Sequence, residues 1–306
     1  MPTKSAQRPE MTKKTYYYAL TNSSGSQTGA GYRRRMSEPQ PDGDELRQDR
    51  TIGTVDLTRW QTPPGRALAG TAAKASQRVG DRGALILILV VGGVIAVALS
   101  FIASRIYDAV TESDGVAGLD RPILDLMITW RSPVLDSVVT AYTNVAGPIG
   151  MPIIAVAAIL ILSLRRRSFT PAILIAAAGV GSLLMTVAGK DIIGRSRPPL
   201  ADAVPPFDFS PSFPSGHTLN AVVIAGVVAY LVLLRRTTTH GRVITIVVAA
   251  LFALTIGVSR VFLGHHWFTD VLAAWVLGGA WLAIVITAHR LYITVRAARA
   301  GSAAFG

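Results

Sequence analysis

Six long apolar segments that carry almost no charge constrain the fold of this 306-residue chain more than any other feature. A helix needs about 20 apolar residues to cross the hydrocarbon core of a bilayer, and each segment comes close to or exceeds that length. They occupy residues 84–104, 141–164, 171–188, 219–234, 243–261 and 271–288. The chain is therefore predicted to be all-α, a six-span transmembrane helical bundle.

The composition agrees with a membrane protein. Half of the residues are apolar and only 16% are charged, whereas soluble domains carry about 25% charged residues. The net charge is +12, which suits either nucleic acid or an anionic membrane surface. Many cations lie in short loops between apolar segments, as in Arg165, Arg166 and Arg167, a placement typical of topology signals. We therefore predict contact with the lipid bilayer and no nucleic-acid binding.

The two ends of the chain flank the predicted bundle, which we place at residues 84–290. Residues 1–80 are rich in Ser, Thr, Gly, Pro, Lys and Arg. Such a composition buries too little apolar surface to offset chain entropy. We predict a disordered basic cytoplasmic tail over 1–80 and a short cytoplasmic tail over 291–306.

Two local features are expected within the bundle. Residues 124–130, between the first two apolar segments, are predicted to form an interfacial helix. Pro148 and Pro152 are expected to bend the first turns of the second span, because proline removes a helical hydrogen bond.

Six spans place both termini on one side of the membrane. The basic loops at 165–167 and 235–242 share that side, so the positive-inside bias makes it the cytoplasm. The loops after the first, third and fifth spans then face outward. Two of these outward loops carry cations, against the bias, and those cations call for another explanation.

The outward cations are Lys190, Arg195, Arg197 and Arg260. Guanidinium groups bind phosphate oxygens in pairs, and lysine adds a compact charge. Each cation alone could equally snorkel to lipid headgroups, but four of them beside two histidines favour a bound anion. We interpret Arg195 as a possible extra phosphate contact.

The motif 214–217, Pro-Ser-Gly-His, opens the fourth span. Ser215 is a plausible helix N-cap, and Gly216 lets the backbone approach a ligand closely. The first amide groups of such a helix form a natural anion site. The alternative is an ordinary capped helix start.

His266 and Asp270 are four residues apart, so they share one helix face if the helix extends back that far. A carboxylate bonded to one ring nitrogen fixes the tautomer and leaves the other nitrogen as a nucleophile or base. A histidine nucleophile can accept a phosphoryl group covalently. His217 would then protonate the leaving oxygen and later activate water.

The remaining histidines and a metal site are the alternatives to this assignment. His265 is five residues from Asp270 and is assigned a structural role, and His240 and His289 are predicted to be surface histidines. Zinc is a possible rival because histidine and aspartate are zinc ligands. The nearby cations would repel a divalent ion, and the absence of cysteine excludes thiolate sites. We expect no metal and no cofactor.

Three motifs in order resemble the signatures of the phosphatidic acid phosphatase type 2 and haloperoxidase superfamily. They are Lys190 with Arg197-Pro198, Pro214 to His217, and Ser259-Arg260 with His266 and Asp270. The resemblance covers about residues 84–288 and implies a membrane lipid phosphatase with six spans and an outward-facing site. It implies that Lys190, Arg197, Arg260, Ser215 and Gly216 hold phosphate. It further implies His266 as nucleophile, Asp270 as its orienting partner and His217 as general acid.

The predicted function is hydrolysis of a lipid phosphate, without a metal, through a phosphohistidine intermediate. Phosphatidic acid, phosphatidylglycerol phosphate and a polyprenyl diphosphate are the candidate substrates. One alternative is a phosphotransferase that uses a sugar or lipid acceptor. Another is a lipid-binding protein that has lost turnover. No pattern in the sequence predicts the oligomeric state.

Overall fold

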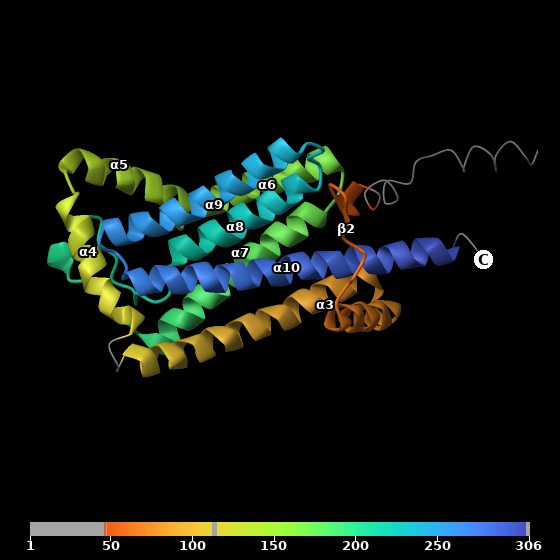
Figure 1. The fold of residues 1–306 in the computed structure, drawn as a ribbon, viewed down its shortest axis with the longest axis horizontal. Helices are drawn as coiled ribbons and strands as arrows, with labels where there is room; N and C mark the ends of the chain where they lie inside the picture. The colour runs from red at the N-terminus through yellow and green to blue at the C-terminus, as the bar shows by residue number, and fades with distance from the viewer. Residues whose placement is uncertain (1–45, 47, 112–114, 304–306) are drawn as a thin grey trace, which may run out of the picture. The chain divides into compact units, whose positions relative to one another are not determined.

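Helices dominate the computed structural model, which describes residues 46, 48–111 and 115–303 (Figure 1). Many side chains within 81–111 and 300–303 fall outside this description. The helices are α3 (Pro63–Thr111), α4 (Asp120–Thr129), α5 (Pro133–Thr143), α6 (Gly150–Arg166), α7 (Thr170–Ile193), α8 (Gly216–Leu233), α9 (Thr239–Phe262) and α10 (Phe268–Ala303). Short 3-10 turns are η1 (Val116–Leu119), η2 (Asn144–Ala146) and η3 (Leu200–Asp202). A two-stranded antiparallel hairpin joins β1 (Thr51–Ile52) to β2 (Val55–Asp56).

Four of these helices, α7 to α10, are long and apolar enough to cross a membrane, as predicted for the last four spans. Helices α5 and α6 qualify only as a pair, bent by 47° at a break that contains Pro148. This break confirms the predicted bend. The described residues therefore hold four or five spans. The remaining predicted span, 84–104, lies inside α3 and is not among them, so the six-span bundle stays a prediction.

Helix α8 lies at the centre of the bundle and packs against α7, α9 and α10. Many of its own residues are buried, among them Leu219, Val223, Val227 and Leu231. A helix that is apolar on all sides belongs in a core. Helix α9 instead keeps a row of apolar side chains exposed, including Val247. An exposed apolar face of this length fits contact with lipid.

Residues 51–80 are structured, contrary to the predicted disorder, whereas residues 1–45 lie outside the described residues. The hairpin is followed by α3, which begins at Pro63 and is broken at Gly80, where φ is 75°. Trp60 donates its indole N–H to Thr294 Oγ1 at 3.1 Å, and the Arg290 guanidinium lies 4.3 Å from the Trp60 ring centre. The composition of residues 1–80 does not reveal this ordered structure, because the residues that pack against it belong to α10, more than 200 residues later in the chain.

The predicted C-terminal tail is also helical. Helix α10 continues to Ala303, and its Leu291 and Val295 are buried against Ala72 of α3. His240 is exposed as predicted. The prediction for His289 was wrong, because its imidazole is fully buried and its Nδ1 lies 2.8 Å from the Tyr230 hydroxyl.

The predicted interfacial helix is confirmed as a helix, α4. It lies across one end of the bundle, whereas the β-hairpin lies near the other end (Figure 1). Arg131, just after α4, donates to the carbonyls of Phe262 and Asp202, both at 2.7 Å. These bonds tie α4 to the end of the bundle where α9 turns into α10.

Candidate active site

Three loops, far apart in sequence, join at the end of the bundle that α4 covers. Backbone hydrogen bonds connect them. The amide of Ser212 donates to the Arg195 carbonyl at 2.8 Å, and the amide of Ser215 donates to the Asp270 carbonyl at 3.3 Å. The amide of Val204 donates to the Leu263 carbonyl at 2.9 Å. The loop after α7, the start of α8 and the α9–α10 turn are thereby held in one place.

Two glycines permit this close approach. Gly264 ends α9 with a positive φ of 68°, and a Cβ there would lie 2.2 Å from the Asp202 carbonyl oxygen. Gly189, in the last turns of α7, would place a Cβ 2.4 Å from the Pro214 ring. Glycine avoids the strain of the positive φ at Gly264 and the clash of a Cβ at both positions. The two glycines therefore let the α9–α10 turn and the loop before α8 approach the other segments.

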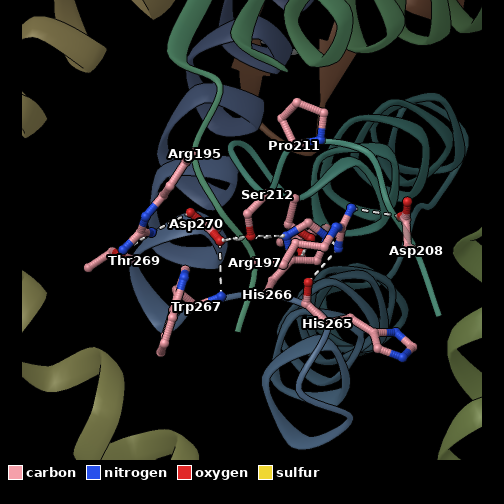
Figure 2. Close-up of polar contacts among 12 residues, drawn as sticks. Arg195, Arg197, Asp208, Pro211, Ser212, His265, His266, Trp267, Thr269 and Asp270 are labelled. Carbon is pink, nitrogen blue, oxygen red and sulfur yellow. Dashed lines mark hydrogen bonds and ion pairs between the residues drawn. The ribbon is translucent and has the colours of Figure 1, made fainter. Parts of the chain in front are cut away.

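His266 lies at the centre of the joined loops, between Arg197 and Ser212 (Figure 2). Its Nε2 is 3.3 Å from Arg197 Nη1, and its Nδ1 is 3.3 Å from Ser212 Oγ. Burial lowers the pKa of the imidazole to about 3; the neighbouring Asp270 opposes this, whereas Arg260 and Arg197 lower the pKa further. A neutral imidazole keeps a lone pair, which a nucleophile requires.

His266 and Asp270 approach each other, but not as two residues on one helix face. Helix α10 begins at Phe268, so His266 lies in the turn before it. The distance from His266 Nδ1 to Asp270 Oδ2 is 3.6 Å, too long for a direct hydrogen bond. Ser212 Oγ lies between them and donates to Asp270 Oδ2.

The loop after α7 brings two predicted cations to one serine. Lys190 donates its Nζ to Ser210 Oγ and, at 2.9 Å, to the Pro211 carbonyl. Arg197 donates to the Ser210 carbonyl at 2.7 Å and forms an ion pair of the same length with Asp208. Burial alone would raise the pKa of Asp208, but Arg197, Ser210 and Lys190 hold it at about 2. Asp208 is therefore an anion that balances these cations.

Arg260 differs from the other predicted cations because its buried Nε has no hydrogen-bond partner among the described residues. Its side chain is on α9 and only 3% of the residue is exposed. Buried donors without partners are rare in folded proteins, so the Nε of Arg260 is a donor that remains available to a bound group.

Arg195 contacts carboxylates. Its guanidinium forms ion pairs with Asp270 and, at 2.6 Å, with Asp120 of α4. It also donates to Thr269 Oγ1 at 2.8 Å and lies 5.7 Å from the Trp267 ring centre. Figure 2 shows Arg195 on the Asp270 side of His266, with Asp208 on the opposite side. The predicted extra phosphate contact stays a prediction, and this geometry favours a different role.

The start of α8 supplies the other predicted residues. Ser215 occupies the N-cap position, but its hydroxyl lies 2.9 Å from Thr218 Oγ1 and does not cap a backbone amide. Gly216 is the first helical residue, and His217 follows it. Arg260 and His266 are both within electrostatic range of His217. The structure thus brings this motif to the same place as the cations and His266.

His265 points away from the centre of the site. Its Nε2 lies 2.7 Å from the Val204 carbonyl oxygen, and this hydrogen bond links the loop before α8 to the α9–α10 turn. This contact fits the structural role predicted for His265. Among the described residues, no three His, Asp or Glu side chains are grouped in a way that could hold a metal ion.

Sequence reasoning missed three side chains of this site. Ser212 bridges His266 and Asp270, Ser210 accepts from Lys190 and Arg197, and Asp120 pairs with Arg195. Ser210 and Ser212 lie just before the Pro-Ser-Gly-His motif, and this position was the available signal. Nothing in the sequence links Asp120 to a loop 75 residues later, because that contact exists only in the folded chain.

The chain is similar to known proteins in both sequence and fold. The sequence model of the PAP2 superfamily matches residues 170–293. Phosphatidylglycerophosphatase B of Bacillus subtilis (strain 168) is 32% identical over 181 residues, which cover 58% of this chain and 87% of that protein.

A solved structure is similar as well. It is described as the first transmembrane PAP2 type phosphatidylglycerolphosphate phosphatase from Bacillus subtilis. The TM-score is 0.55 at 26% identity, covering 62% of this chain and 93% of that one. With its apolar helices, its ordered motifs and these relatives, the chain belongs to the PAP2 superfamily, as a multi-pass membrane phosphatase that acts on phosphoric esters of lipids.

Proposed function

We propose that this protein removes the terminal phosphate of a membrane lipid by way of a phosphohistidine at His266. The observation that carries the proposal is the buried imidazole of His266, whose Nε2 lies 3.3 Å from the Arg197 guanidinium. A phosphoryl group bound by Arg197 would present its phosphorus to that nitrogen. The buried Arg260 supplies further donors for the phosphate oxygens.

The first step of the proposed reaction transfers the phosphoryl group to the protein. His266 Nε2 attacks phosphorus and forms a P–N bond, while the bond from phosphorus to the lipid oxygen breaks. His217 gives its proton to that oxygen, so the lipid leaves as an alcohol. Lys190, Arg197, Arg260, the Ser215 side chain and the Gly216 amide at the start of α8 stabilise the charge on the phosphate oxygens.

The second step releases phosphate. Neutral His217 takes a proton from water, the water oxygen attacks phosphorus, and the P–N bond breaks. Inorganic phosphate leaves, His266 is neutral again and His217 is again protonated. No metal ion takes part in either step.

Phosphatidylglycerol phosphate is the substrate we favour, because both similar proteins are named for it. Phosphatidic acid and a polyprenyl diphosphate present the same terminal phosphate to the site. The proposed orientation places both termini in the cytoplasm and the site at the outer face, where arginines otherwise run against the positive-inside bias.

A phosphate-release panel on purified protein in detergent tests the proposal. Phosphatidylglycerol phosphate, phosphatidic acid and undecaprenyl diphosphate are compared, each with and without a chelator. We expect turnover that the chelator leaves unchanged and that His266→Ala abolishes. Full activity of His266→Ala would refute the proposed nucleophile. Loss of activity with the chelator would refute the metal-free mechanism.

The same intermediate could serve a phosphotransferase. Adding a sugar or lipid alcohol acceptor at increasing concentration separates the two activities. Hydrolysis predicts that release of free phosphate accounts for all substrate consumed. Transfer predicts a phosphorylated acceptor formed in excess of free phosphate. A protein that has lost turnover would give neither product.

A further inference from the structure

The strongest unassigned feature of the molecule is a line of buried hydrogen bonds and ion pairs that leads from His266 to helix α4. It passes through Ser212, Asp270 and Arg195 and ends at Asp120. Ser212 lies at Nδ1 of His266, the ring nitrogen that is not the proposed nucleophile, and Arg195 and Asp120 follow beyond Asp270. We propose that these three are positioning residues, which orient the His266 imidazole through Asp270. The inference rests on the proposed role of His266 as nucleophile.

Ser212 is the link that replaces a direct bond between imidazole and carboxylate. Its hydroxyl hydrogen goes to Asp270 Oδ2, and its oxygen lies 3.3 Å from His266 Nδ1. Since a hydroxyl that donates to a carboxylate can still accept, this pattern fits the tautomer with the proton on Nδ1. That tautomer leaves the Nε2 lone pair on the Arg197 side, where attack on phosphorus is proposed.

Asp270 is held at both of its oxygens. Oδ2 accepts from Ser212 and, at 2.9 Å, from the Trp267 amide, whereas Oδ1 accepts from Arg195. A fully buried carboxylate needs such partners to stay ionised. An ionised Asp270 stabilises the positive imidazole ring that forms when His266 carries a phosphoryl group.

Arg195 is itself held by Asp120. Asp120 is buried at the start of α4 and accepts from Arg195 Nη2 at 2.6 Å, from Thr269 Oγ1 at 2.7 Å and from the Thr269 amide at 2.8 Å. The Asp120 carboxylate therefore binds both the Arg195 guanidinium and the first turn of α10. With one carboxylate at each end, Arg195 has the partners expected of a structural bridge, in contrast to the unpartnered Nε of Arg260.

Arg195→Gln, Asp120→Asn and Ser212→Ala test the inference in purified protein. We expect kcat to fall about 10²-fold for Arg195→Gln and about 10-fold for the other two, because small misorientations of reacting groups cost this much. KM and the inhibition constant of inorganic phosphate should change less than about twofold. The double variant of Asp120 and Arg195 should lose little more than Arg195→Gln alone, since both act along one path.

Asp125→Asn is the matched control. Asp125 pairs with Arg121 on the exposed side of the same helix, and its substitution should leave kcat unchanged. Melting temperatures in detergent separate orientation from misfolding, and Arg195→Lys, which keeps the charge, should recover part of kcat. A melting loss that accounts for the whole activity loss would overturn the inference.

Two further outcomes would also overturn it. A weaker inhibition by phosphate in Arg195→Gln would make Arg195 a phosphate ligand, and unchanged kcat in all three variants would leave the path without a role. His266→Ala is assayed alongside. If it is inactive while these variants equal wild type, only the positioning inference fails; if it is active, the proposed nucleophile fails first.

Discussion

Buried arginines occur at both ends of the helix bundle, and the two groups differ in how their charges are balanced. At the end opposite the site, Arg166 and Arg235 share the buried Asp49, each at 3.3 Å. At the site end, Lys190 and Arg197 lie around Ser210 and Asp208, while Arg260 has an unpartnered Nε. Helix α7, 24 residues long, separates the groups by about 36 Å.

The difference separates Arg260 from the cations whose partners lie in the chain. A buried ion pair with all its partners in the chain holds segments together, and removing one partner leaves an uncompensated charge. A buried cation without partners does not stabilise the fold in this way and is better explained by an external anion. The arginine clusters look alike in the sequence, so only the pairing distinguishes them.

Arg260→Gln should have the largest effect. Loss of donors to a charged transition state reduces rates by about 10²- to 10³-fold, and we expect a loss of this size in kcat/KM. The melting temperature should stay equal or rise, because the substitution removes a buried charge. Phosphate-release kinetics and thermal unfolding in detergent measure both. A marked fall in melting temperature would place Arg260 with the structural arginines and break the comparison.

Asp49→Ala should show the reverse pattern. It leaves Arg166 and Arg235 without their shared carboxylate, and removing one partner of a buried pair typically costs about 3 kcal/mol or more of stability. Activity per folded molecule should not change, because the pair lies far from the site. Denaturation in detergent measures the loss of stability, and kcat measures the activity per folded molecule. A variant as stable as wild type would show that this end tolerates unbalanced cations too.

Acid should weaken the site end through His265. Burial and the nearby Arg260 lower the pKa of His265 to about 4, below the value of about 6.5 of an unfolded histidine. Between these values the unfolded chain binds a proton that the folded chain does not, so stability falls as pH falls from about 6.5 to about 4. His265→Gln should flatten this dependence in melting curves from pH 7 to pH 4. An equally steep pH dependence of stability in His265→Gln would contradict the assignment of this effect to His265.

Trp60→Phe should have the smallest effect. It removes the hydrogen bond to Thr294 but leaves an aromatic ring for Arg290, so the expected loss of stability is about 1 kcal/mol. Thr294→Val removes the other partner of the same bond and should cost a similar amount. A loss several times larger in Trp60→Phe alone would mean that the contact is central to docking residues 51–80 on α10.

Much of this protein could be predicted from short patterns. Uncharged apolar runs predict the helices α7 to α10 because a bilayer leaves the backbone few other ways to satisfy its hydrogen bonds. Three motifs predicted the family. They also predicted which loops meet, because Lys190, His217 and His266 each lie at the end of such a run. Patterns within a few residues carry these inferences, and they need no knowledge of distant contacts.

The pairing of charges was decided by the tertiary structure alone. Arg195 and Arg197 are two residues apart, yet one contacts Asp120 and Asp270 and the other Asp208 and His266. The order of residues 51–80 and the burial of His289 likewise depend on partners far along the chain. Such partners are not encoded by local periodicity or composition, because they become neighbours only when the helices pack. The sequence therefore determined which residue types gather at this end of the bundle, and packing decided the partners with which each of them pairs.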